Sequence, residues 1–228
     1  MYENERELQV DLKNYLNTAG YIAVVDRLDY FDVIGVKCPK SLLKYRFDIT
    51  GFNNLVCGFF GHSTIKDVYY GLKENLSVSE ISKKLNLAWT STMYRINWLL
   101  KCNLVKKIGE NKYEVINPFI SFEDYEAVYI EAKLINWKKG INQCISGKAA
   151  FDKVYLGVPY SKVHLVINFE ELSEHGIGLI GVGDENEIIL EAKFNEMANK
   201  ELKRLQLEYH WYEESLIELG YIPRAHHP

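Results

Sequence analysis

The sequence has no run of about 18 uncharged apolar residues, the minimum for a membrane-spanning helix. The N-terminal stretch MYENERELQVDLKNYL is charged and has the pattern of a helix rather than that of a signal peptide. Internal repeats and low-complexity segments are also missing. We therefore expect a soluble protein with a cytoplasmic location and no membrane partner.

Cysteine is scarce, and its spacing matches no common site. The cysteines are Cys38, Cys57, Cys102 and Cys144. They form no CxxC pair and have no histidine at a metal-ligand spacing, which argues against a zinc site and a disulfide framework. We expect free, mostly buried thiols. The histidines have no Ser or Cys partner at a recognisable spacing, so no nucleophilic triad is predicted.

The chain has ample apolar content and an uneven charge. Of its 228 residues, 47% are hydrophobic and 13% aromatic, enough for the core of one large or two small domains. The net charge is −4, but residues 64–117 hold nine Lys/Arg against five Asp/Glu. A basic segment inside an acidic chain predicts a separate module with a partner of its own.

The basic segment changes its periodicity twice. Ser77 or Ser79 can cap a first helix, and Thr90 or Ser91 a second one. The apolar positions at helical spacing are Ile81 and Leu85 in the first helix and Met93, Ile96, Leu99 and Leu100 in the second. In LVKKIGENKYEVI, the residues GEN then separate two short β-patterned runs, which predicts a hairpin.

Helix, tight turn, helix and hairpin in this order resemble the winged helix-turn-helix family, with HSTIKDVYYGLKEN as the leading helix. If the module binds DNA, its second helix, 88–101, would enter the major groove. The candidate contacts on that helix are Trp89, Ser91, Thr92, Tyr94 and Arg95. On the wing, Lys106, Lys107 and Lys112 would contact phosphates. Two alternatives are a protein-interaction module and lysines that only keep a small domain soluble.

The flanking segments predict one α/β domain around this module. A helix over residues 3–17 and the strand-like runs YIAVVDRLDYFDVIGVK and YRFDITGFNNLVCGFF precede it. Several strands and helices follow, ending in a long helix over 194–219. We therefore expect a discontinuous domain, 1–61 with 118–228, interrupted by an insert at 62–117. The aromatic HWYEESL segment of the last helix would face the partner in a homodimer or pack in the core.

The tripeptide Glu-Ala-Lys occurs twice, and its context differs. In a strand, Glu131 and Lys133 would share one face while Ala132 points to the other. An earlier strand offers Asp32, an acid with apolar neighbours on both sides, and burying such a carboxylate is costly without a cation or donors. The second copy, Glu191 and Lys193, follows a turn and leads into the last helix, so we expect solvated residues there.

The flanks resemble the PD-(D/E)XK nuclease superfamily, whose restriction-endonuclease-like core runs helix, three strands, helix, strand, with a mixed sheet flanked by helices. The resemblance matches Asp32 to the motif Asp, Glu131 and Lys133 to the Glu-x-Lys, and Gln143 to the glutamine of the following helix. Phe31 stands where the superfamily name has proline. Asp26 and Asp29 are alternative motif acids, and Glu5 or Glu7 on the first helix is a further candidate.

The resemblance implies a DNA endonuclease that uses Mg²⁺ or Mn²⁺. Asp32, Glu131 and the carbonyl of Ala132 would hold the metal, and Lys133 would orient the attacking water. Gln143 would orient the nucleophile or contact phosphate. The alternative is a DNA-binding regulator or scaffold whose nuclease-like domain is inactive, because one fold hosts many functions.

Overall fold

The chain divides into two compact units. The computed structural model describes residues 2–26, 30–50, 63–116, 125–183 and 186–224. The first unit consists of Met1–Pro39 and Ser121–Pro228, and the second of Lys40–Ile120. The insert expected at 62–117 lies inside the second unit, whose N-terminal limit falls earlier in the sequence.

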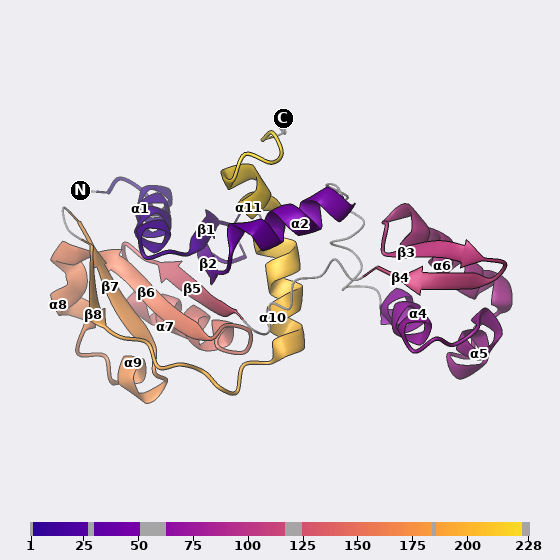
Figure 1. Ribbon diagram of the computed structural model, residues 1–228. Coiled ribbons are helices and arrows are strands. Elements are labelled where there is room, and N and C mark those ends of the chain that lie inside the picture. The colour runs from indigo at the N-terminus through magenta and orange to yellow at the C-terminus, as the bar shows by residue number, and fades with distance from the viewer. Residues whose placement is uncertain (1, 27–29, 51–62, 117–124, 184–185, 225–228) are drawn as a thin grey trace. The chain divides into compact units, whose positions relative to one another are not determined.

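The first unit is an α/β structure built on a mixed six-stranded sheet (Figure 1). The strands are β1 (Ile22–Val25), β2 (Val33–Lys37), β5 (Glu126–Ala132), β6 (Lys153–Pro159), β7 (Gly178–Val182) and β8 (Glu187–Leu190). Their order is β1-β2-β5-β6-β7-β8. Neighbours β5, β6 and β7 run parallel, and all other neighbouring pairs are antiparallel. Strands β2 and β5 thus pair side by side although the second unit separates them in sequence.

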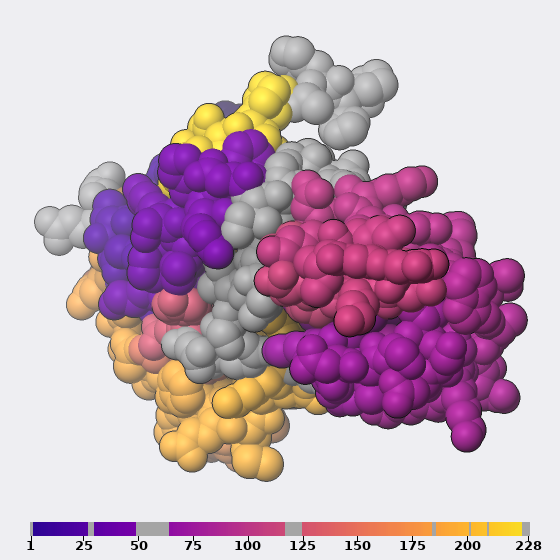
Figure 2. Space-filling model, turned by 45° about the vertical axis from the view of Figure 1, so that its right-hand side comes forward, coloured from indigo at the N-terminus to yellow at the C-terminus, as the bar shows by residue number. Residues whose placement is uncertain are grey.

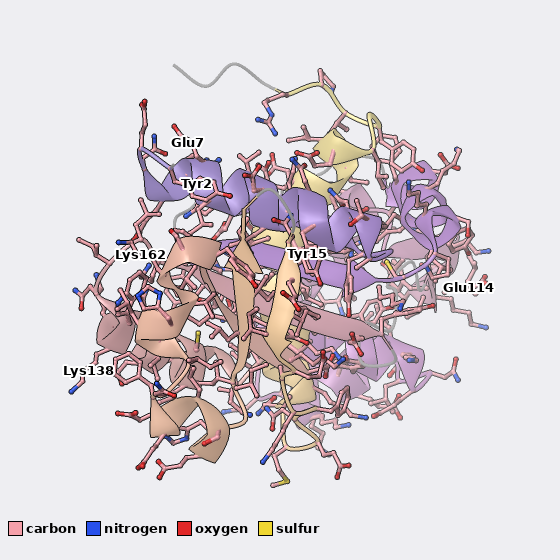
Figure 3. The ribbon with its side chains drawn as sticks, turned by 90° about the vertical axis from the view of Figure 1, so that its left-hand side faces the viewer. Tyr2, Glu7, Tyr15, Glu114, Lys138 and Lys162 are labelled. Carbon is pink, nitrogen blue, oxygen red and sulfur yellow. The ribbon has the colours of Figure 1, made fainter. Side chains whose placement is uncertain are left out.

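Helix α1 (Glu5–Thr18) covers one face of this sheet. The side chain of Asn4 caps the helix by accepting a hydrogen bond from the backbone N–H of Glu7. The apolar positions Leu8, Leu12 and Leu16 recur every four residues and are buried in the same core as Val128, Ile130 and Ala132 of β5. Figure 3 shows Tyr2 and Glu7 near the N-terminal end of this helix and Tyr15 toward its other end.

Helix α7 (Trp137–Gly147) covers the opposite face and lies unusually close to β5. Figure 3 shows Lys138, at the start of α7, well away from α1. Gly140 and Gly147 face the strand. A Cβ added to Gly140 would come within 2.8 Å of Cγ of Lys133, and one added to Gly147 would overlap the ring of Tyr129. The two glycines therefore let the helix rest directly on side chains of the strand.

The C-terminal segment completes the core of the first unit. It consists of α10 (Lys200–Gln206), a π-helical stretch η3 (Leu207–Trp211) and α11 (Tyr212–Glu218). Trp211 and Tyr212 are buried, and the indole Nε1 of Trp211 donates to the carbonyl of Ile22 at 2.8 Å. Of the two interpretations of HWYEESL, core packing is the one that the structure supports. The long helix predicted from residue 194 begins later, at Lys200.

The short helices α8 (Val163–Val166) and α9 (Glu170–Glu174), with the 3-10 turn η2 (Tyr160–Lys162), connect β6 to β7. Leu172 and Ile177 of this connection are both buried in the core. Gly176 ends this connection with a φ of 62°, a left-handed conformation that glycine adopts without steric cost. These helical turns thus form the crossover connection that the parallel strands β6 and β7 require.

The second unit contains helices and one hairpin. Its elements are α2 (Lys40–Thr50), α4 (Ser63–Lys73), α5 (Val78–Lys84), α6 (Trp89–Lys101), β3 (Val105–Gly109) and β4 (Lys112–Val115). Residues of α4, α5 and α6, including Val68, Ile81, Ile96 and Leu99, share one buried cluster. Figure 2 shows the hairpin in pink on the surface of this unit, beside the purple atoms of its helical part.

Two local predictions in this unit are settled by helix capping. Ser77 caps α5 in a reciprocal capping box with Glu80, so the first of the two predicted caps is confirmed. The prediction of Thr90 or Ser91 as the cap of α6 is wrong, because the helix begins at Trp89 and its N-cap, Ala88, makes no side-chain bond. The β-patterned run after α6 forms the predicted hairpin, with Asn111 in the left-handed conformation at its turn.

The strand expected in YRFDITGFNNLVCGFF is wrong over residues 45–50, which belong to α2. The β-branched and aromatic residues suggested a strand, but Leu43 and Arg46 are buried and lie on one side of a helix. An ion pair between Lys44 and Asp48, four residues apart, spans a helical turn at 2.7 Å. Helical spacing therefore outweighs β-propensity here. The rest of this run, 51–60, lies outside the described residues.

The described residues also bear on the expectations about membrane-spanning helices and cysteines. None of the described helices is both long enough and apolar enough to cross a membrane. Cys38, Cys102 and Cys144 are free thiols, and the last two are buried. Cys57 lies outside the described residues.

We expect the substitution Gly147→Ala to destabilise the protein by about 1–3 kcal/mol, because the added methyl group overlaps the buried ring of Tyr129. This loss outweighs the gain of up to about 1 kcal/mol that alanine brings to a helix. Urea unfolding measures the difference. Gly183→Ala is the matched control, because its new Cβ would lie an ordinary 3.4 Å from Tyr160. Equal stability of the two variants would contradict the close packing of α7 on β5.

Candidate active site

Three carboxylates from distant parts of the chain surround one lysine. The ammonium Nζ of Lys133 lies 2.5 Å from Oε1 of Glu131 and 3.6 Å from Oδ2 of Asp32. It also lies 3.5 Å from Oε2 of Glu5 and donates to the carbonyl of Ala132 at 3.0 Å. The structure thus brings together the predicted Asp32, Glu131, Ala132 and Lys133. Of the two candidate acids on the first helix, Glu5 belongs to this group.

Strand β5 places the glutamate and the lysine on the same side. Alternate residues of a strand point to opposite faces, so Val128, Ile130 and Ala132 face α1. Tyr129, Glu131 and Lys133 take the other alternation, where α7 lies over them. The backbone N–H of Lys133 donates to the carbonyl of Gly157 at 2.9 Å, which continues the pairing with β6 one residue past the strand. Both charged side chains are therefore held at the carboxyl end of β5.

Asp32 is fixed in the site by two hydrogen bonds. Its Oδ2 accepts from the backbone N–H of Ala132 at 2.7 Å, and its Oδ1 accepts from Nε2 of Gln9 at 2.7 Å. The residue immediately precedes β2, whose first residue, Val33, is the antiparallel partner of Ile130. The sheet register and α1 thus both orient this carboxylate toward the end of β5.

The other candidate acids have different structural roles. Asp26 is buried, and its Oδ2 accepts from the backbone N–H groups of Tyr30 and Phe31 at 3.1 and 3.0 Å. It also pairs with Nδ1 of His210 at 2.9 Å, so its carboxylate contacts the residues just before Asp32 and the C-terminal segment. Glu7 accepts from the backbone N–H of Glu3 at the exposed start of α1. Asp29 lies outside the described residues.

Burial and mutual repulsion act on the acids of the site. Burial raises the pKa of Asp32, Glu5 adds to the effect, and the Lys133 ammonium opposes it. Burial also raises the pKa of Glu131, and the neighbouring Asp32 raises it further. Burial alone would lower the pKa of Lys133, but the surrounding carboxylates together raise it. The lysine therefore stays charged and is the cation that keeps the acids close together.

Tyr129 is a member of the site that the sequence did not point out. Its hydroxyl donates a hydrogen bond to Oε2 of Glu131, the oxygen that Lys133 does not contact most closely. The only sequence signal for this contact is the spacing of two residues, which places both side chains on one strand face. Burial, followed by the charge of Glu131, raises the pKa of the Tyr129 hydroxyl, which therefore remains a donor.

Within the part of the chain that the structure describes, Gln143 makes no hydrogen bond to this cluster. It is half-buried on α7, and its Oε1 is buried without a hydrogen-bond partner among the described residues. It lines a pocket together with Tyr129, whose hydroxyl reaches Glu131. Tyr129 is thus the residue that links the pocket of Gln143 to the carboxylates.

The oxygen donors of this site suit a hard divalent cation that takes few of its ligands from the protein. Among the described residues, no group of three or more His, Cys, Asp or Glu is placed to hold a metal ion. Asp32 and Glu131 supply two carboxylates at one ammonium, and Ala132 adds a carbonyl oxygen. Magnesium is commonly bound by one or two carboxylates and retained waters. Oxygen ligands of this number and kind therefore fit Mg²⁺ or Mn²⁺ better than zinc.

The second Glu-Ala-Lys copy has no comparable surroundings. Oε1 of Glu191 accepts from the hydroxyl of Tyr155 at 2.6 Å and pairs with Lys153 at 3.3 Å. Its side chain is 59% exposed, and Lys193 is exposed as well. The expectation of solvated residues at this position is confirmed.

Helix α6 of the second unit presents part of the predicted DNA-contacting set. Trp89 and Tyr94 are 50% and 69% exposed, which is unusual for large aromatic side chains. Ser91 is half-buried. Nη1 of Arg95 donates to the carbonyl and to Oγ of Ser91, at 2.8 and 2.7 Å, so the guanidinium lies back along its own helix.

Thr92 is a correction to this set, because its side chain is fully buried. Its hydroxyl accepts a hydrogen bond from Oγ of Ser82 at 2.8 Å, and Ser82 in turn belongs to α5. Thr92 lies on the buried side of α6, together with Ile96 and Leu99, and not on its exposed face. Thr92 therefore joins the two helices and is not available to a ligand.

The hairpin carries the predicted lysines on its surface. Lys106, Lys107 and Lys112 are all exposed. Nζ of Lys106 lies 2.9 Å from Oε2 of Glu114 on the opposite strand, so its charge is partly balanced within the hairpin. An exposed pair of this kind contributes little to stability and leaves the lysine able to change partners.

Comparisons with known proteins do not narrow the choice of function. Neither protein-family models nor curated proteins nor solved structures give a significant match to this chain. The convergence of Glu5, Asp32, Glu131 and Lys133 is therefore the main guide to what the chain does.

We expect Lys133→Met to lower the free energy of unfolding by about 3–5 kcal/mol near pH 8, because the buried acids lose their balancing cation. The loss should be smaller near pH 5. Without the ammonium, the raised pKa values of Asp32 and Glu131 rise further, so the carboxylates take up protons more readily in the folded than in the unfolded state.

Urea unfolding at the two pH values measures this difference. Lys153→Met is the control, because that lysine pairs with Glu126 and Glu191 at a more exposed position. A pH-independent loss for Lys133→Met, or an equal loss for the control, would contradict the balancing role of Lys133.

Proposed function

We propose that the chain is a Mg²⁺-dependent DNA endonuclease of the PD-(D/E)XK type, carrying an inserted winged helix. The order α1, β1, β2, β5, α7, β6 supports this, because it corresponds to helix, three strands, helix, strand. The insert falls between β2 and β5, the two strands that bear the acids. DNA is then the partner and the cytoplasm the proposed location.

The observation that carries the proposal is the contact of Asp32 and Glu131 with the same ammonium. The two acids are far apart in sequence, yet each lies within 3.6 Å of Nζ of Lys133. Two carboxylates at about 4 Å repel by about 4 kcal/mol at an effective dielectric constant near 20. A fold that accepts this cost in a buried place, at the end of a central strand, is typical of a functional site.

Each residue of the site has a role in phosphodiester hydrolysis. Asp32, Glu131 and the carbonyl of Ala132 would hold the metal. When bound, Mg²⁺ or Mn²⁺ would supply an activated water and neutralise charge on the phosphate. The ammonium of Lys133 would hold the attacking water and stabilise negative charge on the phosphoryl oxygens.

The residues around this group orient it. Tyr129 holds one oxygen of Glu131 through its hydroxyl, so the other oxygen remains for Lys133 or a metal. Gln9 holds Asp32 in the same way. Gln143 presents an amide oxygen without a partner among the described residues and would contact the nucleophile or a phosphate through its amide group.

The second unit would deliver the nuclease domain to DNA. Its helices α4, α5 and α6 and its hairpin follow the winged-helix order, and the segment 64–117 carries an excess of basic residues. On α6, the proposed contacts are Trp89, Ser91, Tyr94 and Arg95. On the hairpin they are Lys106, Lys107 and Lys112. The lysines would contact phosphates and position the protein without reading sequence.

The second candidate is a DNA-binding regulator or scaffold with an inactive nuclease-like domain. One observation favours it. Lys133 already pairs with all three acids, so the cluster is able to serve as a structural ion-pair network. Exposed Trp89 and Tyr94 would equally suit a protein-interaction module. Cleavage assays separate these possibilities from the endonuclease.

We expect the wild-type protein to cleave plasmid or branched DNA with Mg²⁺ or Mn²⁺, and Asp32→Asn, Glu131→Gln and Lys133→Ala each to lower the rate at least about a hundredfold. Mg²⁺ should also raise the melting temperature of the wild type but not of Asp32→Asn, which reports binding without turnover. Lys153→Ala is the control from the same sheet. Absence of cleavage on every substrate, or equal cleavage by Lys133→Ala, would rule out the nuclease assignment.

We expect Arg95→Ala combined with Lys106→Ala to weaken DNA binding and to reduce its dependence on salt, because two DNA-contacting cations are lost. Binding is measured at several salt concentrations in EDTA. Lys83→Ala combined with Lys84→Ala is the matched control, because both are exposed lysines at the end of α5. An unchanged salt-dependent affinity in the first variant would remove the second unit from the DNA-binding surface.

A further inference from the structure

A pocket of about 490 Å³ adjoins the candidate active site. This volume lies in the range of about 300–1,000 Å³ that is typical of small-molecule sites. Aromatic rings of Tyr30, Phe31 and Tyr129 form part of its wall. The amides of Asn142, Gln143 and Gln206 line it as well. The pocket therefore combines flat apolar surfaces with groups that both donate and accept hydrogen bonds.

The wall of the pocket is shared with the carboxylate site. Tyr129 lines the pocket, and its hydroxyl donates to Glu131. Phe31 also lines it and is the residue next to Asp32 in the chain. The rings of Phe31 and Tyr129 meet edge to face, with centroids 5.1 Å apart. A molecule in the pocket would thus contact the side chains that adjoin both acids.

The charge of the lining differs from that of the neighbouring site. Among the described lining residues there is no Asp or Glu, and Lys139 is the one charged residue. A neutral aromatic and amide lining suits a nucleobase, which stacks on rings and carries donors and acceptors at its edge. A phosphate would instead require several cations.

The polar groups of the pocket also call for a partner. Oε1 of Gln143 is buried and has no hydrogen-bond partner among the described residues, and such a group costs free energy until a donor reaches it. An exocyclic amino group of a base is a donor of the right kind. Tyr30 is 67% exposed, and its ring stacks on His210 with centroids 5.4 Å apart, so it is held in place at the pocket.

We propose that this pocket receives an unpaired nucleobase of the DNA strand that is cut, a role that rests on the proposed endonuclease function. The base would stack on the exposed ring of Tyr30 and donate to the amide oxygen of Gln143. It would meet Phe31 edge to face, because the rings of Tyr30 and Phe31 are inclined by 81° to one another. The phosphodiester next to it would then lie at Lys133, beyond Tyr129. The substrate class is DNA with an unstacked nucleotide, as in bulges, branches and single strands, rather than continuous duplex.

The test uses the wild-type chain in EDTA and a DNA duplex with one unpaired 2-aminopurine, next to the same duplex in which the 2-aminopurine is paired. We expect tighter binding of the first duplex and a change in 2-aminopurine fluorescence on binding. Ser146→Phe places a ring in the pocket from the exposed side of α7. It should weaken binding of the first duplex at least about tenfold, abolish the fluorescence change, and leave binding of the paired duplex unchanged.

Ser173→Phe is the matched control. Ser146 and Ser173 are both exposed helix serines whose hydroxyls donate to a backbone carbonyl of their own helix, but Ser173 lies on α9, outside the described pocket lining. Equal binding of the two duplexes by the wild type, or an unaltered fluorescence change in Ser146→Phe, would overturn the pocket assignment.

Cleavage with Mg²⁺ separates this inference from the nuclease function. Cleavage of both duplexes at equal rates, without a fluorescence change, would overturn the pocket and leave the nuclease intact. A fluorescence change that is lost in Ser146→Phe, together with no cleavage of either duplex, would support the pocket and overturn the nuclease.

Discussion

The balance between the Lys133 ammonium and the carboxylates around it is the interaction on which the first unit depends. Lys133 and Glu131 are almost fully buried, and neither charge would be tolerated there without the other. Glu5 and Asp32 bring α1 and the start of β2 to the same point. A single cation therefore links the first helix, the second strand and the central strand of the sheet. Any displacement of these elements would leave a buried charge without its partner.

Close packing on both faces of β5 keeps this group in place. On one face, Leu8 and Leu12 of α1 are packed into the core with Ile130. On the other, two glycines let α7 approach until its backbone meets the side chains of Tyr129 and Lys133. The long stem of Lys133 is confined between strand and helix, which fixes where its ammonium lies. The precision of the site thus comes from apolar contacts that take no part in its chemistry.

The sequence predicted the parts of the site that depend on local rules. Alternation along a strand was enough to place Glu131 and Lys133 on one face, and the apolar neighbours of Asp32 marked it as an acid in an unusual setting. Tyr129 and Gln9 were missed because their bonds to the acids follow from tertiary contacts.

The errors have the same origin. Thr92 was counted with the exposed face of α6, although its hydroxyl is bound by Ser82 of the preceding helix. The side-chain types of residues 45–50 predict a strand, but these residues belong to α2, in which Leu43 and Arg46 are buried three residues apart, a helical spacing. In both cases the residue types indicate a local conformational preference. They do not indicate which residues of other elements would bury them.

The register of β2 and β5 has a consequence for how the chain is assembled. Val33 pairs with Ile130 at the end that carries the acids, and Lys37 pairs with Glu126 at the other end. The two crossings from the first unit to the second therefore leave the sheet from neighbouring positions, as the two arms of a hairpin do. In terms of chain connectivity, the second unit takes the place of the turn that would otherwise join these two paired strands, and the acid-bearing ends of both strands stay in register with the insert present.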